Sequence, residues 1–177
     1  MKRFAMILIS LMCFLVSCSP TQMLMDFPPQ NEATIADKTF DKITSAINTQ
    51  DDAKIVQLFS KNIQNEIDEL QQQSRSLLDF IEGNIVSVSA AKDSGVGSHI
   101  NNNKGKTIKE IESAFTVETT ERTYHFFVRE CIKDESDDGA VGLLCIYIID
   151  AEDWAEDFVY RGDGEQTRGI IIVDDKA

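Results

Sequence analysis

The spacing of apolar residues changes at Gly83, and this change constrains the fold more than any other feature of the chain. Before Gly83 the apolar residues recur every three or four positions, which is the period of an α-helix. After Gly83 they alternate with polar residues, which is the period of a strand with one buried face. Helices followed by strands predict an α+β domain in which N-terminal helices pack on one face of a curved antiparallel sheet.

Three helices are expected before Gly83, and the third is the longest. The first carries an apolar stripe of Phe40, Ile43 and Ile47. The second is short, and Asp51 or Asp52 is placed to cap it. The third follows the capping residue Ser60 and keeps its apolar stripe for about five turns, to Ile81.

The strands expected after Gly83 are rich in β-branched and aromatic residues. A short strand opens at residue 85, and a polar loop over 93–106 follows it. An acidic turn over 134–139 joins two of the later strands as a hairpin. These later strands are expected at 108–120, 124–132, 143–149 and 169–173. The start of the first is ambiguous, because Ile108, Ile111 and Phe115 would also suit a helix, but Phe115-Thr116-Val117 favours a strand.

The N-terminus has the order of charge and hydrophobicity of an export signal. Lys2 and Arg3 are positive, and the apolar run Phe4–Val16 is shorter than the roughly 20 residues that cross a bilayer. The run ends in Leu15-Val16-Ser17-Cys18, which resembles the lipobox of bacterial lipoproteins. We therefore expect residues 1–17 to be a lipoprotein signal peptide and Cys18 to carry the lipid that anchors the protein to the cell membrane.

The rest of the chain is strongly acidic. The whole chain has a formal net charge of −13, and loss of Lys2 and Arg3 leaves 15 basic and 30 acidic residues, or −15. Such a chain is repelled by nucleic acid and by anionic headgroups, so the lipid must hold it outside the cytoplasm. Residues 18–36, with three prolines, predict a flexible tether, and 37–177 predict a single domain.

The hairpin around the acidic turn predicts which residues share a face. If the turn is centred near Asp138, Cys131 lies opposite Cys145, and export to an oxidising compartment would allow a disulfide between them. One face is predicted to be core and consists of Phe126, Val128, Ile132, Leu144, Ile146 and Ile148. The other face is mixed and carries His125, Phe127, Arg129 and Tyr147.

The mixed face is the candidate binding face. It either lines a pocket, is covered by a partner's sheet in a homodimer, or is a partly exposed face with amphipathic side chains. Trp154, between two acidic residues, either caps the core or forms the rim of a pocket.

Most chemistries fail on residue spacing. Gly105-Lys106-Thr107 lacks the earlier glycine of a phosphate-binding loop, and the acidic turn has Cys145 where a calcium loop needs glutamate. His99 and His125 are too far apart for a zinc motif. We therefore expect no cofactor and no metal, and only His125 with Asp150 remains as a candidate acid–base pair.

Five short segments, together with the order of helices and strands, carry a family resemblance. They are Leu58-Phe59-Ser60, Gly83-Asn84-Ile85, Phe115–Thr120, Val141-Gly142-Leu143 and Gly169-Ile170. On these segments the chain resembles a family of uncharacterised, mostly Gram-positive bacterial lipoproteins, a domain of unknown function with a nuclear-transport-factor-like or cystatin-like fold. The resemblance implies a cone of helices and curved sheet, but it supplies no catalytic residue.

Two functions from different classes follow. The preferred one is a membrane-anchored, non-enzymatic module that binds a small ligand or another envelope protein. It requires a pocket or an exposed patch that includes Phe127 and Tyr147. The alternative is a small hydrolase or isomerase, which requires His125 to face an enclosed cavity beside a carboxylate.

Overall fold

The computed structural model describes residues 32–90, 95–103, 105–153 and 166–173. Within these ranges the helices are α2 (Glu32–Asn48), α3 (Asp52–Leu58), α4 (Lys61–Glu66) and α5 (Leu70–Phe80). The strands are β1 (Ile85–Val88), β2 (Val96–Asn103), β3 (Lys106–Thr119), β4 (Thr123–Asp134), β5 (Gly142–Asp150) and β6 (Gly169–Val173). Single 3-10 turns, η3 (Asp138–Ala140) and η4 (Ala151–Asp153), flank β5. The predicted α+β class is confirmed.

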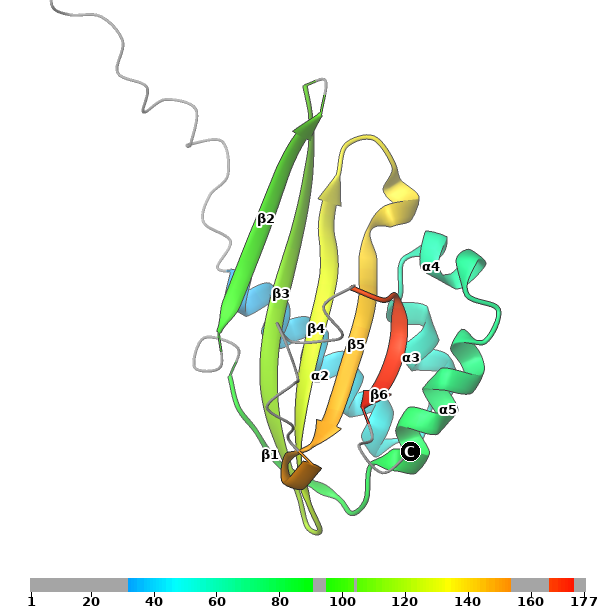
Figure 1. Cartoon of the computed structure of the whole chain (residues 1–177), viewed down its shortest axis with the longest axis vertical. Helices are drawn as coiled ribbons and strands as arrows, with labels where there is room; N and C mark the ends of the chain where they lie inside the picture. The colour runs from blue at the N-terminus through cyan, green and yellow to red at the C-terminus, as the bar shows by residue number, and fades with distance from the viewer. Residues whose placement is uncertain (1–31, 91–94, 104, 154–165, 174–177) are drawn as a thin grey trace, which may run out of the picture. The chain divides into compact units, whose positions relative to one another are not determined.

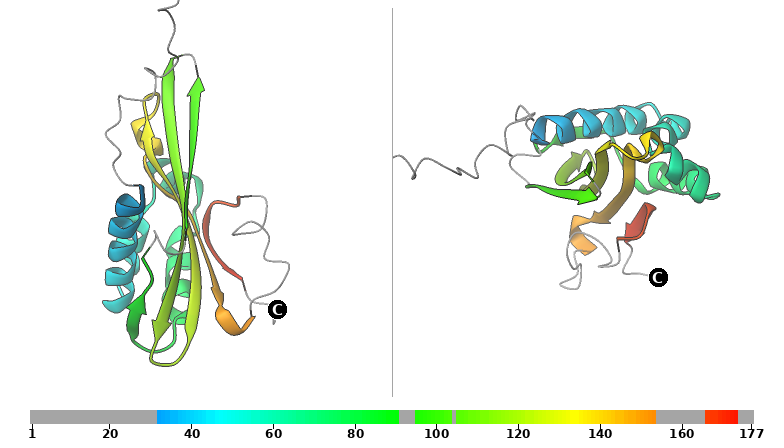
Figure 2. Two further views of the ribbon diagram at one scale, coloured as in Figure 1. Left: turned by 90° about the vertical axis from the view of Figure 1, so that its left-hand side faces the viewer. Right: turned by 90° about the horizontal axis from the view of Figure 1, so that it is seen from above.

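The strands form one curved, open sheet in the order β1-β3-β4-β5-β6, and β2 also pairs with β3 (Figure 1). β1 and β2 lie on the same side of the long strand β3. They occupy different parts of it, because β1 pairs with residues 117–119 and β2 with residues 106–113. All these pairings are antiparallel except that of β5 with β6. The helix α2 lies across one face of the sheet (Figure 2).

Three aromatic rings join α2 to the sheet. Phe40 stacks on Phe115 with ring centroids 3.9 Å apart and meets the edge of Phe126 at 5.2 Å. Phe126, Val128, Ile146 and Ile148 belong to the main buried cluster, while Ile132 and Leu144 pack against it. The predicted core face of the hairpin is therefore confirmed.

The predicted helix caps are present, but the third helix is broken in two. Asp51 accepts a hydrogen bond from Lys54 N at 3.0 Å, and Ser60 accepts one from Ile63 N at 3.3 Å. At Ile67 the backbone becomes extended and ends α4. The apolar stripe keeps its helical spacing across this break, so the spacing could not reveal it. None of the described helices is long and apolar enough to cross a membrane.

Two predicted boundaries are wrong. The expected tether ends at residue 36, yet α2 begins at Glu32, because Ala36 is buried and Ala33 and Ile35 pack against the core. The expected polar loop over 93–106 contains β2. This strand lies at the edge of the sheet and holds its place through main-chain bonds to β3, so it does not need alternating apolar residues.

The hairpin register differs by two residues from the expected one up to Arg129, and by three after a bulge between Arg129 and Glu130. This difference removes the predicted disulfide. Arg129 lies opposite Cys145, and Cys131 lies opposite Gly142. Both cysteines are buried, and they are not joined in a disulfide. Cys145 is three positions along β5 from Gly142, so the two cysteines are offset at least as far as diagonal neighbours. Diagonal pairs lie roughly 7–8 Å apart, beyond the Cα separation that most disulfides allow. A shift of two keeps the side chains on their faces, which is why the predicted faces are correct up to the bulge. At the bulge Leu143 is fully buried, and the predicted core residue Leu144 is only partly buried.

Candidate ligand-binding cleft

The mixed face of the hairpin, which the sequence predicts to bind a ligand or partner, is largely buried. Phe127 and Tyr147 belong to a second apolar cluster with Ala114 and Cys145, and they are only 9% and 2% exposed. The segment before and within β6 contributes to their burial: Ile171 and Val173 pack on this cluster, and the Tyr147 hydroxyl donates to Thr167 O at 2.9 Å. The expected exposed patch of Phe127 and Tyr147 is therefore wrong. Trp154 and Cys18 lie outside the described residues.

Arg129 also lies on this face, in a network of polar contacts. Its Nε donates to Glu110 Oε2 at 3.0 Å, and it also contacts Glu112 and Gln166. Arg129 therefore links β3 and β4 to the segment that precedes β6.

His125 and Asp150 do not form the expected acid–base pair. In the hairpin Tyr124 pairs with Asp150 and His125 with Ile149, so the two side chains point to opposite faces of the sheet. His125 Nδ1 lies 3.2 Å from Thr116 Oγ1, and burial lowers the pKa of the imidazole. The pairing prediction is wrong because adjacent strand positions alternate between faces.

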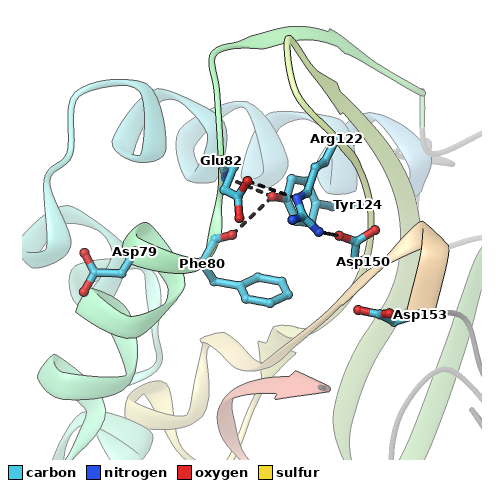
Figure 3. A pocket seen from close by; sticks show the side chains of 7 residues that line it. All are labelled: Asp79, Phe80, Glu82, Arg122, Tyr124, Asp150 and Asp153. Atoms are coloured by element: carbon cyan, nitrogen blue, oxygen red, sulfur yellow. Dashed lines mark hydrogen bonds and ion pairs between the residues drawn. The ribbon is translucent and has the colours of Figure 1, made fainter. Parts of the chain in front are cut away.

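Asp150 belongs instead to a cleft of ≈ 230 Å³ (Figure 3). The end of α5, the turn before β4, the end of β5 and the turn η4 meet there. The lining residues are Asp79, Phe80, Glu82, Arg122, Tyr124, Asp150 and Asp153. We call this the Arg122 cleft.

Arg122 is held between two carboxylates (Figure 3). Its Nε donates to Glu82 Oε2 at 3.1 Å, and its Nη1 donates to Asp150 Oδ2 at 2.6 Å. Asp150 is 2% exposed, and its other oxygen accepts from Glu152 N at 2.9 Å. The hydrogen bonds that Arg122 donates to both carboxylates raise its pKa above its already high value, so the guanidinium is a permanent cation.

Tyr124 fixes the backbone at the entrance of the cleft. Its buried hydroxyl accepts from Glu82 N at 2.9 Å and donates to Phe80 O at 3.2 Å. Burial raises the pKa of this hydroxyl, so it stays protonated. The ring centroids of Tyr124 and Phe80 lie 5.5 Å apart. The half-buried Phe80 forms an apolar wall of the Arg122 cleft.

The charge of the cleft is negative. Four of its lining residues are carboxylates, and two of these already compensate Arg122. An adjoining hollow of ≈ 420 Å³ shares Arg122 and Asp150 and adds Glu118, Glu121 and Glu152. A concave site with excess carboxylates and an aromatic wall favours a positively charged group. The described residues contain no cluster of His, Cys, Asp and Glu that could hold a metal ion.

Sequence reasoning missed Arg122, Tyr124 and Glu82 as members of a site. An arginine in a turn between two strands is most often a solvated surface residue, and nothing in its neighbours distinguishes it. Asp150 did carry a signal, because it directly follows the apolar run Ile146–Ile149. A carboxylate at the end of a buried strand requires a partner, and that partner is Arg122.

The fold and the cleft define an α+β domain with a charged cleft at one end of its sheet. The family model described as "Domain of unknown function (DUF5104)" matches residues 42–151, and the chain belongs to this family. The matched segment contains Glu82, Arg122, Tyr124 and Asp150, so the four residues that shape the cleft lie inside the family domain. No curated protein matched the chain.

Proposed function

We propose that this protein is a lipoprotein of the cell envelope, anchored through Cys18, whose domain is a non-enzymatic module that binds a positively charged group in the Arg122 cleft. The observation that carries the proposal is the arrangement of Arg122 between Glu82 and Asp150 in a cleft with further carboxylates. We also propose that the helices and curved sheet represent the nuclear-transport-factor-like or cystatin-like cone.

The groups in the cleft suit binding better than proton transfer. General acid–base catalysis needs a group that titrates near the working pH. The pKa values of Arg122 and Tyr124 are both raised, so neither group exchanges its proton near neutrality. His125, the base of the hydrolase hypothesis, points to the opposite face of the sheet from Asp150.

The ligand class follows from charge and shape. An amine or guanidinium group would meet carboxylates at the rim and the ring of Phe80 at the wall. Such a group occurs in small organic cations and in the lysine or arginine side chains of a protein partner. The net charge of −13 attracts cations of either kind over a longer range.

Binding of a cation is expected to depend on Glu82. Replacing Glu82 by glutamine removes one rim charge and leaves Arg122 less compensated, so affinity for a cation should fall by about fivefold. Titration of the full chain in detergent with spermidine and, separately, with a short lysine-rich peptide would measure this. Preference for one probe would distinguish a small ligand from a protein partner.

The matched control is the exposed Glu69, which lies outside the cleft at the start of α5. Its change to glutamine should leave both titrations unaltered. Equal losses in the two variants, or no binding of either probe at millimolar concentration, would reject the Arg122 cleft as a cation site.

Anchoring is expected to depend entirely on Cys18. The acidic domain is repelled by anionic headgroups, whereas multiple acyl chains hold a protein stably on a bilayer. Cys18→Ala should abolish incorporation of a labelled fatty acid and leave either released protein or uncleaved precursor. Cys13→Ala, within the apolar run, should still incorporate the label. A Cys18→Ala protein that is still labelled and membrane-bound would contradict the proposal that Cys18 carries the lipid anchor.

A further inference from the structure

The two edges of the sheet differ in how their main-chain groups are covered. At the β6 edge, Ile170 N donates to the Gln73 side chain at 3.0 Å, and α5 packs beside the strand. At the opposite edge, β1 and β2 pair with β3 on one side only, and none of the described strands lies on their other side (Figure 1). The edge formed by β1 and β2 is therefore the open edge of the described part of the chain.

The open edge lacks the residues that usually protect an edge strand. Such strands commonly carry lysine, other charges or proline, which prevent pairing with another chain. β2 reads VGSHINNN and β1 reads IVSV, so neither contains a charged residue or a proline. The only titratable side chain there is His99, whose Nε2 lies 3.6 Å from Glu112.

The main chain of β2 presents an unused set of donors and acceptors. Ala114 N of β3 donates to Gly95 O at 3.2 Å, so Gly95 and Ala114 form a hydrogen-bonded pair, and the main-chain groups of Gly95 point toward β3. Antiparallel pairs alternate, so the N–H and C=O groups of every second residue point away from β3. These residues are Val96, Ser98, Ile100 and Asn102.

Exposed apolar residues also gather at this edge. The described chain has four exposed large hydrophobic residues, and three of them lie on β1 and β2: Val86 at 61%, Val88 at 40% and Ile100 at 57%. The fourth is Val141, 43% exposed, which precedes β5. Scattered exposed hydrophobic residues need no explanation, but a concentration on one open edge marks an interaction surface.

We propose that β2 pairs antiparallel with β2 of a second copy of this chain, so that the two sheets join across a twofold axis. Antiparallel self-pairing brings residues of one strand against the same residues of its copy, and like charges opposite each other would oppose it. β2 has none. Several charges of β3 opposite β2 have partners, since Lys109 pairs with Glu32 at 2.7 Å, and Glu110 and Glu112 both contact Arg129. β2 is thus a neutral strand and fits a neutral strand such as its own copy.

This dimer does not use the Arg122 cleft or the lipid anchor, and it differs from the dimer suggested by sequence. That dimer would cover the mixed face of the hairpin, whose Phe127 and Tyr147 are already buried within one chain. The proposed contact lies at the edge of the sheet instead.

The test is the mass of the full chain in detergent, measured by analytical ultracentrifugation over a concentration series. The natural chain should dimerise, and Ile100→Lys should weaken the dimer at least about 100-fold, because both copies of β2 then bring a positive charge to the contact. Val141→Lys is the matched control and should dimerise like the natural chain. Ile100 is largely exposed, so its variant should keep the thermal midpoint of the natural chain.

A second variant tests the main-chain contact. Ser98→Pro removes an outward N–H without removing a bond to β3, so it should also give monomers. Raising the salt concentration should strengthen the dimer, because it screens repulsion between two chains of charge −13.

Three results would overturn the proposal. They are a natural chain that stays monomeric at all concentrations, a dimer that survives both Ile100→Lys and Ser98→Pro, and a monomer whose edge instead captures a different extended polypeptide.

Discussion

Replacing Glu130 by glutamine is expected to stabilise the fold by about 2 kcal/mol at pH 8 and to change its stability little at pH 5. Glu130 is 6% exposed and points from β4 toward α2, where its Oε2 accepts from Thr39 Oγ1 at 2.9 Å. Its Oε1 is buried and has no hydrogen-bond partner among the described residues. The carboxylate is therefore poorly compensated.

The surroundings of Glu130 explain its ionisation. Its neighbours in register are the apolar Ile111 and Leu143, and the cation that acts on it is Lys42 of α2. Burial raises the pKa of Glu130 to about 7 from an ordinary value of 4.5, and the bond from Thr39 only partly offsets this.

The direction of the pH effect follows from the raised pKa. Below pH 4.5 Glu130 is protonated in both the folded and the unfolded chain, so it costs nothing. Between pH 4.5 and about 7 only the unfolded chain loses the proton, and stability falls by about 1.4 kcal/mol per pH unit. Above pH 7 the full penalty, about 3 kcal/mol, remains. Glutamine removes this slope but leaves an unpaired amide, which reduces the expected gain to about 2 kcal/mol.

Urea denaturation at pH 5 and pH 8 would measure the effect. Glu69→Gln, at an exposed position, is the control and should follow the natural chain at both pH values. If Glu130→Gln and the natural chain lose the same stability between pH 5 and pH 8, the pKa of Glu130 is not raised by burial in the folded protein.

Replacing Gly142 by alanine is expected to destabilise the fold by about 3 kcal/mol. Gly142 has φ +132°, which side chains rarely adopt, and an added Cβ would lie 2.7 Å from Ser60 N and 2.9 Å from Ser60 Cα. These are backbone atoms, and Ser60 N also donates to Leu143 O at 3.0 Å, so the contact cannot be relieved by a side-chain rotation.

Gly97→Ala is the matched control for this substitution. An added Cβ at Gly97 meets nothing within 4 Å, so the urea midpoint should move little or rise slightly. A Gly142→Ala protein with a midpoint close to that of Gly97→Ala would show that the link from α3 to β5 is looser than its geometry indicates.

Some of the fold could be predicted because its causes are local. The caps at Asp51 and Ser60 depend on a side chain and an amide three positions later. The faces of the β4–β5 hairpin depend only on the period of two, so up to the bulge after Arg129 they were correct even though the register was displaced by two residues. The same displacement made the Cys131–Cys145 disulfide wrong, because a disulfide depends on register and not on period.

The candidate site could not be predicted, because its members are distant in the chain. Arg122 lies 40 positions from Glu82 and 28 from Asp150, yet it bonds to both. The end of α5, the turn between β3 and β4 and the end of β5 meet only after the helices have packed on the sheet. No local spacing encodes such a meeting.

The sequence by itself determined the class of the fold, the faces of its principal hairpin and the strong negative charge, because each depends on composition or on a short period along the chain. It also predicts the lipid anchor, through four consecutive residues that end in Cys18. Only the tertiary structure decided the register of the hairpin, the burial of Phe127 and Tyr147, the open edge at β2 and the Arg122 cleft. These depend on which distant segments pack together, and that is set by the total free energy of the fold and not by any local pattern.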